Sequence, residues 1–353
     1  MKYYIQLAIV SLVIGGCSTP RLPLGELPES LPTFDVKINE GNAFDGYLFV
    51  RKRFSPGAQI MIDQSGNVVW YLLSDTALFR PSTPYETSFV ALHSDREAYE
   101  ISYKGDTLNQ WIYDKQGGFN SPLHHEIVKD SEHNLVALSY KHIPFDLSTQ
   151  GGTVDDSLRI DGVVKLSPDG ERLWSWFLDE HVDPNVEPEA ASKNINGHSN
   201  SLLIDTDGHY LISWKNFNQV WKINSTDGSI LWKYGIREEL PEEEWITGQH
   251  AVHINLNGDY MVLDNGTKVT RAFGFKRNSN ETFTNTLTIE LPDSLYSLKQ
   301  GSVYQFAEDR FLFCSSQTKT LIVTNSPGDI LWLATSKEPF YRANYLPKEI
   351  FDH

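Results

Sequence analysis

The chain has 353 residues, of which 40% are hydrophobic and 12% aromatic, so it can bury a large core as one repeat-built domain or as two ordinary ones. Its net charge of −16 and the absence of any run rich in Lys and Arg exclude nucleic acid as an expected partner, because an acidic surface repels phosphate backbones. An anionic small molecule would need a locally positive pocket inside this acidic shell.

The N-terminus has the pattern of a secretory signal, in which Lys2 precedes an apolar run, Tyr3–Ile14, and the small residues Gly15-Gly16. Ile-Gly-Gly-Cys resembles the lipobox of bacterial lipoproteins, so we expect residues 1–16 to be removed and Cys17 to be acylated. The alternatives are an ordinary signal with an incidental Cys, or a membrane anchor, although the run is shorter than the ~20 residues that span a bilayer. Ser18, rather than Asp, favours the outer membrane. The expected localisation is therefore periplasmic, on a lipid anchor.

Residues 17–33 are rich in Pro and Leu without periodicity, which is typical of an extended tether. We expect one domain over residues 34–353. Cys314 would have no partner for a disulfide within the chain, and it is expected to be a buried strand residue.

A repeat runs through the rest of the chain, and each copy reads as a strand, a Gly turn and a second strand that ends in an aromatic residue. The copies lie at Ile60–Tyr71, Tyr99–Tyr113, Val163–Trp176, Val220–Gly235 and Ile322–Leu333, and Arg271–Leu291 fills the sixth place without a Trp. A second phrase, strand–turn–strand, precedes four of them, at Leu123–Leu138, His198–Ser213, Gly248–Leu263 and Lys299–Cys314. Six repeats of four strands predict an all-β, six-bladed β-propeller with antiparallel blades. An eight-bladed propeller with degenerate blades is the alternative.

Helical signal is sparse. The segment Arg237–Trp245 is compatible with one short acidic helical turn. Phe145–Ile160 and Asp179–Ile195 are long, polar and contain Pro or Gly, so we expect loops that cover one mouth of the propeller.

Aligning the turns of the second phrase places His125, Asn200 and His250 at one position of three consecutive blades. His198 lies two residues before Asn200 and therefore points to the same face of its strand. Because the first strand of each blade lines the central channel, these side chains should converge on the axis. Gly301 occupies the same position in a further repeat and would leave room for a ligand. Lys215 ends the second strand of its blade and could supply the positive charge that an anion needs.

Other interpretations of these residues remain open. His124 could replace His125 as the inward residue, although strand alternation allows one of the two and the register selects His125. Zinc is the main rival, since three His can bind it; Asn200 and Lys215 among them, with no carboxylate in register, favour a site without metal. The remaining histidines are expected to be structural or on the surface, namely His93, His133, His142, His181, His209 and His253.

Seven short motifs in order resemble the bacterial arylsulfate sulfotransferases that do not use the nucleotide sulfate donor. They are HHEI at His124–Ile127, GHSNS at Gly197–Ser201, SWK at Ser213–Lys215, DGSILWKYG at Asp227–Gly235, GQHAV at Gly248–Val252, LDNG at Leu263–Gly266 and YRANYL at Tyr341–Leu346. The resemblance runs from about Asp45 to about Leu346. It implies a six-bladed propeller, no cofactor, an aryl sulfate donor and a phenolic acceptor.

The resemblance also implies roles for individual residues. The nucleophile that becomes a sulfohistidine falls on His250, the channel histidine of the HH motif on His125 or else His124, and the H-x-N pair on His198 and Asn200. Where the family usually has Arg, this chain has Lys215, which keeps the charge but loses a planar, two-pronged grip on sulfate.

The mechanism expected from these roles is ping-pong sulfuryl transfer. Neutral His250 attacks sulfur, while Lys215, Asn200 and His198 hold the sulfate oxygens. Either His125 or His198 exchanges a proton with the phenolic oxygens. Two alternative functions remain: a non-catalytic propeller lipoprotein that serves as an outer-membrane scaffold, and a protein that binds an anionic ligand without chemistry.

Overall fold

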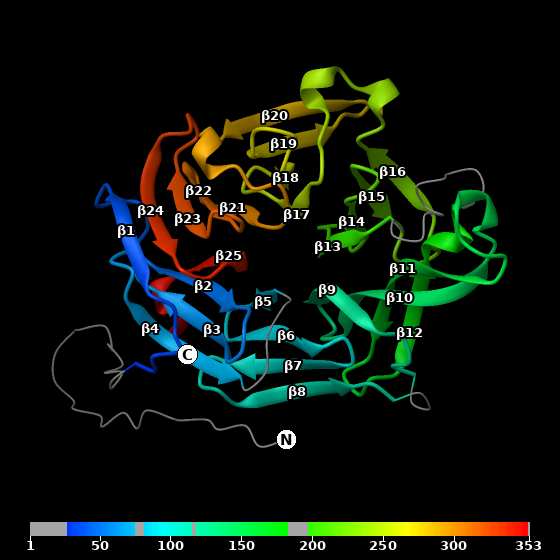
Figure 1. The fold of residues 1–353 in the computed structure, drawn as a ribbon, viewed down its shortest axis with the longest axis horizontal. Helices are drawn as coiled ribbons and strands as arrows, with labels where there is room; N and C mark the ends of the chain where they lie inside the picture. Colours follow the sequence, from blue (N-terminus) through cyan, green and yellow to red (C-terminus); the bar gives the residue numbers. More distant parts are fainter. Residues whose placement is uncertain (1–26, 75–80, 115–117, 183–196, 352–353) are drawn as a thin grey trace.

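The computed structural model of the chain describes residues 27–74, 81–114, 118–182 and 197–351. Six antiparallel sheets form a ring around a central axis, as Figure 1 shows, and this confirms the predicted six-bladed propeller. The expected signal peptide and Cys17 lie outside the described residues, so they remain predictions. Among the residues described, no helix is long and apolar enough to cross a bilayer.

Four blades are formed by consecutive strands, numbered from the axis outward. Blade 2 consists of β5 (Ser82–Pro84), β6 (Ser88–Ser94), β7 (Glu97–Ser102) and β8 (Thr107–Ile112). Blade 3 consists of β9 (Leu123–Lys129), β10 (Leu135–Phe145), β11 (Asp156–Leu166) and β12 (Arg172–Phe177). Blade 4 consists of β13 (Ser199–Ile204), β14 (Tyr210–Trp214), β15 (Gln219–Ile223) and β16 (Ile230–Tyr234). Blade 5 consists of β17 (His250–Ile254), β18 (Tyr260–Asp264), β19 (Arg271–Arg277) and β20 (Phe283–Glu290).

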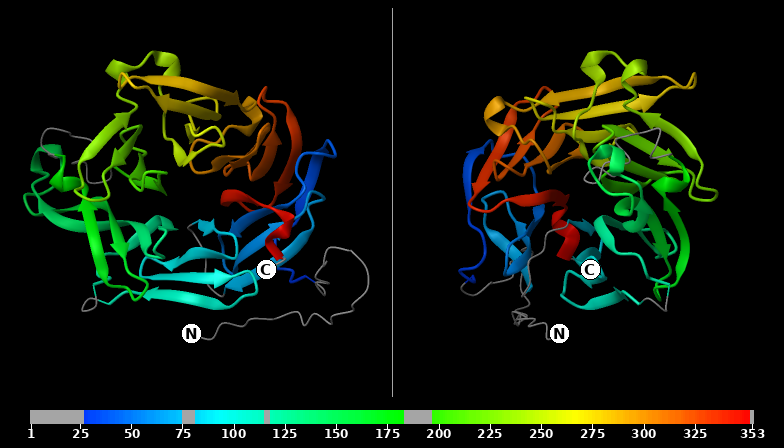
Figure 2. Two further views of the ribbon diagram at one scale, coloured as in Figure 1. Left: turned by 180° about the vertical axis from the view of Figure 1, so that it is seen from behind. Right: turned by 45° about the vertical axis from the view of Figure 1, so that its right-hand side comes forward.

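The other two blades close the ring with strands from the two ends of the chain. Blade 1 combines β2 (Tyr47–Lys52), β3 (Gly57–Ile62) and β4 (Val68–Ser74) with the C-terminal β25 (Phe340–Leu346) as its innermost strand. Blade 6 contains β21 (Ser302–Ala307), β22 (Arg310–Ser315), β23 (Thr320–Thr324) and β24 (Ile330–Ser336), and β1 (Phe34–Asn39) adds a fifth, outermost strand. Both views of Figure 2 show the red C-terminal strand beside the blue N-terminal strands.

The recurring Trp of the repeat joins neighbouring blades. In four blades it sits on the fourth strand counted from the axis, and its indole N–H donates to a backbone carbonyl in the turn before the fourth strand of the next blade. The four such bonds are Trp70 to Tyr103 at 2.8 Å, Trp111 to Ser167 at 2.9 Å, Trp176 to Gly228 at 2.9 Å and Trp332 to Gln64 at 2.7 Å. Each Trp therefore buries a large apolar surface and still satisfies its polar N–H.

The segments between strands are short 3-10 helices and turns. The expected acidic turn near 237–245 appears as two such helices, η3 (Arg237–Glu239) and η4 (Glu242–Glu244). The other 3-10 helices are η1 (Ser148–Gln150), η2 (Leu178–Glu180), η5 (Asp293–Leu295) and η6 (Lys348–Phe351). Cys314 is buried in β22 as a free thiol, as predicted.

The sequence predicted two long loops. The structure corrects the bounds of the first and describes little of the second. Phe145–Ile160 is a loop only over residues 146–155, because β10 ends at Phe145 and β11 already begins at Asp156, and the two strands pair along all eleven positions of the hairpin. Most of the second expected loop, residues 183–196, lies outside the described residues. Within the expected tether, Leu31 is buried in the apolar core shared by blades 1 and 6, and its N–H donates to the Pro28 carbonyl at 2.9 Å.

Candidate active site

The innermost strands of blades 3 to 6 begin with irregular backbone, and this aims side chains at the axis. His125 and His198 both have φ near 50°, Ala251 has φ 55° and Gln300 has φ 65°. Such left-handed conformations are costly for residues other than Gly and persist where the surrounding structure enforces them. In β9, β13 and β17 the pairing with the neighbouring strand also shifts register at or just after this entry.

Three predicted histidines are neighbours at the centre of the ring, where β9, β13 and β17 begin. The rings of His125 and His198 have centroids 5.1 Å apart, and the ring of Tyr341 lies 6.2 Å from His125 and 6.2 Å from His250. His250 is close enough to His198 for that residue to influence its charge. The shared central position predicted from the turn alignment is therefore present in the fold.

His250 is buried at the centre without polar partners among the described residues. It is 2% exposed, and neither of its ring nitrogens has a hydrogen-bond partner in the described chain. Burial, together with the charges of Arg342, His198 and Lys215, holds the pKa of His250 well below its usual value. The imidazole is therefore neutral at neutral pH and retains a lone pair.

Lys215 directly follows β14 and is held beside His198, because its backbone N–H donates to the His198 carbonyl at 3.1 Å. Within the described residues, its side chain forms no ion pair and no hydrogen bond. Burial, followed by the charges of Lys215 and Arg159, lowers the pKa of His198 to about 4. A cation without a counter-charge next to two neutral imidazoles is an arrangement that suits an anionic ligand.

Asn200 is fully buried and connects two of the innermost strands. Its side-chain N–H donates to the backbone carbonyl of Gln249 at 2.7 Å, and its side-chain oxygen has no partner in the described chain. Gln249 immediately precedes His250, so Asn200 fixes the backbone from which His250 projects.

The two histidines of the HH motif point in different directions. The ring of His125 neighbours His198 and Tyr341, whereas His124 contacts its own blade, with Nε2 3.1 Å from the Ser139 carbonyl oxygen. The strict alternation expected from a regular strand fails here, because four residues of β9 span the distance of two residues of β10. The two rings consequently touch, with their Nδ1 atoms 2.7 Å apart.

Sequence reasoning assigned no role to several residues that surround this centre. The side chain of Arg342 is 4% exposed; its guanidinium forms an ion pair with Glu126 and donates to the backbone carbonyl of Asn200 at 2.8 Å. Arg53 lies over the Tyr341 ring, with its guanidinium carbon 5.8 Å from the centroid. The YRANYL and HHEI motifs contain Tyr341, Arg342 and Glu126, but β25 lies outside the repeats, so the turn alignment could not place it.

Gly301 does not leave room for a ligand, contrary to the expectation. Its φ is 95°, and a Cβ there would lie 2.4 Å from the backbone oxygen of Cys314 and 2.8 Å from the Leu263 side chain. The absence of a side chain at this position instead allows β22 to approach closely.

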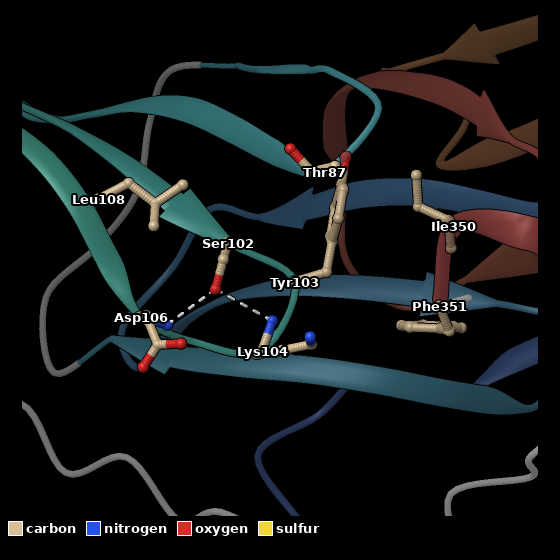
Figure 3. Close-up of a pocket in the computed structure, with 8 residues that line it drawn as sticks. All are labelled: Thr87, Ser102, Tyr103, Lys104, Asp106, Leu108, Ile350 and Phe351. Carbon is tan, nitrogen blue, oxygen red and sulfur yellow. Dashed lines mark hydrogen bonds between the residues drawn. The ribbon is translucent and has the colours of Figure 1, made fainter. Parts of the chain in front are cut away.

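Two further observations concern other kinds of site. Among the described residues, no group of three or more His, Cys, Asp or Glu is arranged to hold a metal ion. A pocket of about 340 Å³ lies far from the histidines, between the β7–β8 turn and η6 (Figure 3). Its wall consists of Thr87, Ser102, Tyr103, Lys104, Asp106, Leu108, Ile350 and Phe351. No predicted site residue lines it.

Comparison with known proteins adds a family to this geometry. The sequence model described as Arylsulfotransferase (ASST) matches residues 36–285, which is well over half of the chain. No curated protein sequence gives a significant match.

Several solved structures resemble the chain at low sequence identity. A protein of unknown function from Bacteroides caccae is similar with a TM-score of 0.56 and 12% identity, over 86% of this chain and 99% of that one. Virginiamycin B lyase from Staphylococcus aureus matches with a TM-score of 0.47 and 9% identity, over 86% of this chain and 88% of the lyase. BamB from Moraxella catarrhalis matches with a TM-score of 0.42 and 11% identity, over 91% of this chain and 84% of BamB.

Proposed function

The chain belongs to the arylsulfotransferase family, and from this premise we propose that it transfers a sulfuryl group from an aryl sulfate to a phenol through a sulfohistidine at His250. The observation that carries the proposal is a buried imidazole whose two nitrogens have no hydrogen-bond partner among the described residues, beside a lysine that has no counter-charge among them. A nucleophile must be unprotonated to attack, and an anionic substrate must be held against it.

In the first half of the proposed reaction, the lone pair of His250 attacks sulfur as the bond between sulfur and the aryl oxygen breaks. By analogy with phosphoryl transfer, the transition state is loose and places charge on the peripheral and leaving oxygens. Lys215 lies where it can neutralise part of this charge. In the second half, the acceptor oxygen attacks the same sulfur, the S–N bond breaks and neutral His250 returns.

Proton exchange with the two phenols falls to His125 in this proposal. The lowered pKa of His198, about 4, makes that residue a poor proton donor at neutral pH, since almost none of it carries the extra proton. His198 can still donate its single N–H to a sulfate oxygen as a neutral group. Asn200 keeps one side-chain N–H for the same purpose, because the Gln249 carbonyl uses only the other.

The first prediction concerns the nucleophile. His250→Asn removes the attacking lone pair while keeping a polar side chain, so transfer from 4-nitrophenyl sulfate to an added phenol should fall at least about 10³-fold. The measurement is nitrophenolate release by absorbance, with circular dichroism to show that the variant is folded. His209→Asn is the matched control, because His209 lies on the turn before β14 and its ring contacts Ser225 of its own blade.

The outcomes of the same assay separate the competing functions. Release that depends on the added phenol indicates a transferase, and release without it indicates a sulfatase. A scaffold or a protein that only binds anions releases nothing. A folded His250→Asn variant with full phenol-dependent activity would reject the assigned nucleophile.

A further inference from the structure

A line of polar contacts leads from the interior of blade 3 to the central histidines. Asp161 on β11 is 1% exposed; one of its oxygens accepts from the backbone N–H and hydroxyl of Ser199 at 2.9 and 3.1 Å. Its other oxygen accepts from Arg159 Nε at 2.9 Å and lies 3.7 Å from Nε2 of His124. His124 in turn meets His125 through their Nδ1 atoms. The line therefore runs from a carboxylate through two imidazoles.

The partners of His124 restrict where its protons lie. The Ser139 carbonyl can only accept, so the contact at 3.1 Å requires a proton on Nε2 of His124. If His124 is neutral, its Nδ1 is then an acceptor, and the 2.7 Å contact requires His125 to donate from its own Nδ1. Neutral His125 consequently carries its lone pair on Nε2. If the pair takes up one proton, His124 becomes doubly protonated and His125 carries a proton on Nε2.

We propose that His124 and His125 act as one proton relay, in which Nε2 of His125 exchanges a proton with the phenolic oxygen and His124, backed by Asp161, stores the charge. This inference rests on the proposed sulfuryl transfer. His124 and Asp161 are positioning residues in this scheme, because they act through His125. The relay deepens the proposed mechanism by assigning the acid and base of both half-reactions to one pair.

The proton balance closes over the two half-reactions. As the donor's S–O bond breaks, Nε2–H of His125 gives its proton to the phenolate oxygen, and Nδ1–H of His124 passes to Nδ1 of His125. As the acceptor attacks, its O–H proton moves to Nε2 of His125, and the Nδ1 proton returns to His124. One proton leaves in the first half and one enters in the second.

The charged groups around the pair favour storage on His124. The central side of His125 faces neutral His198 with the cation Lys215 beyond it, so a positive charge there is disfavoured. On the β25 side, Tyr341 neighbours His125, and Arg342 is already paired with Glu126 from β9 itself.

The side of His124 differs, because the groups there come from β10 and β11. The Tyr140 ring lies 5.8 Å away with the Arg159 guanidinium 4.1 Å over it, and the carboxylate of Asp161 accepts from Arg159. Burial raises the pKa of Asp161 to about 6, against the opposing effect of Arg159, so Asp161 is ionised at neutral pH. The nearest counter-charge for an imidazolium is thus on the His124 side.

The test replaces His124 by Gln and compares two donors. Gln can still donate to the Ser139 carbonyl and accept from His125, but it cannot take up a proton. Phenolate is a poor leaving group that needs a proton, whereas 4-nitrophenolate leaves readily without one. In single turnovers without acceptor, His124→Gln should therefore slow phenyl sulfate about 100-fold more than it slows 4-nitrophenyl sulfate. His142→Gln is the matched control, because His142 is exposed on β10 and neighbours the same Tyr140 ring.

A second variant tests the stored charge. Asp161→Asn keeps an oxygen for the Ser199 N–H but removes the counter-charge, so His124 should lose its proton at lower pH. In the pH–rate profile for phenyl sulfate, the alkaline limb should then shift to lower pH by about one unit, as expected for the loss of an opposite charge within about 4 Å.

The relay and the underlying function fail in different ways. Equal slowing of both donors in folded His124→Gln, or an alkaline limb that Asp161→Asn does not move, overturns the relay while leaving sulfuryl transfer intact. Absence of phenol-dependent transfer in the wild-type protein overturns the proposed function itself.

Discussion

The charge state of His250 follows from its neighbours. Burial and the charges of Arg342, His198 and Lys215 all disfavour the imidazolium. Because protonation removes the attacking lone pair, activity should fall only at a pH well below 6.5, the usual pKa of histidine. In the proposed mechanism, burial and the neighbouring charges therefore keep the assigned nucleophile neutral.

This predicts the pH dependence of kcat/KM for 4-nitrophenyl sulfate. The rate should be level from about pH 8 down to at least about pH 6.5, since kcat/KM reports the pKa values of the free enzyme. Lys215→Met removes one positive neighbour, so the pKa of His250 should rise and the acidic limb should move to higher pH. Lys215→Arg keeps the charge and is the control, whose limb should stay in place. If the acidic limb of the wild-type kcat/KM profile had its midpoint above pH 6.5, the prediction would be contradicted.

Turn alignment was enough to predict that His125, His198 and His250 meet, because propeller blades repeat the same path around one axis. It was insufficient to show that His124 and His125 touch, since it assumed a regular strand and β9 carries extra residues at that point. Nor could it assign partners such as Asp161 to His124, because those contacts depend on side-chain directions within the bulge.

At the scale of elements, the repeat revealed the third and fourth strands of every blade, counted from the axis, but not how the ring closes. The recurring Trp marked the outer strands, and the structure explains its recurrence by hydrogen bonds between blades. Strands β1 and β25 each occur once and lack the repeat, so sequence periodicity carried no information about them. The long β10–β11 hairpin was misread because its polar residues look like a loop.

The contact between β25 and β9 should matter for stability. Glu126 is 6% exposed and pairs with Arg342 across the centre, while Thr83 of β5 donates to the same carboxylate at 3.3 Å. Arg342→Met leaves the buried carboxylate of Glu126 without its counter-charge and should lower the free energy of unfolding by about 3–5 kcal/mol. Adding Glu126→Gln should restore part of this loss, because no uncompensated charge then remains.

Urea unfolding followed by fluorescence measures both variants. Arg277→Met is the control, since Arg277 pairs with the largely exposed Glu281, and its effect should stay within about 1 kcal/mol. If Arg342→Met alone were as stable as Arg342→Met combined with Glu126→Gln, the ion pair would not be what holds β25 and β9 together.

For the whole molecule, the ring brings one set of cations inward while the chain as a whole carries a charge of −16. Arg53, Lys215 and Arg342 come from blade 1 and blade 4, so no single segment of sequence shows a basic cluster. This explains why composition alone indicated an acidic protein, and why the positive centre emerges only when the blades close. The lipid anchor at Cys17 remains a prediction from sequence.

Closure by the two ends leads to a prediction about truncation. A chain that starts at residue 42 loses β1, but blade 6 keeps four strands, so it should fold with a lowered Tm and retain transfer activity. A chain that ends at residue 339 loses β25, which pairs with β2 from Tyr47 to Lys52 and supplies Tyr341 and Arg342 to the centre. Blade 1 then lacks its innermost strand, and Glu126 lacks its counter-charge. This shorter chain should show neither a cooperative thermal transition by calorimetry nor nitrophenolate release, and retention of either property would mean that β25 is not required to close the ring.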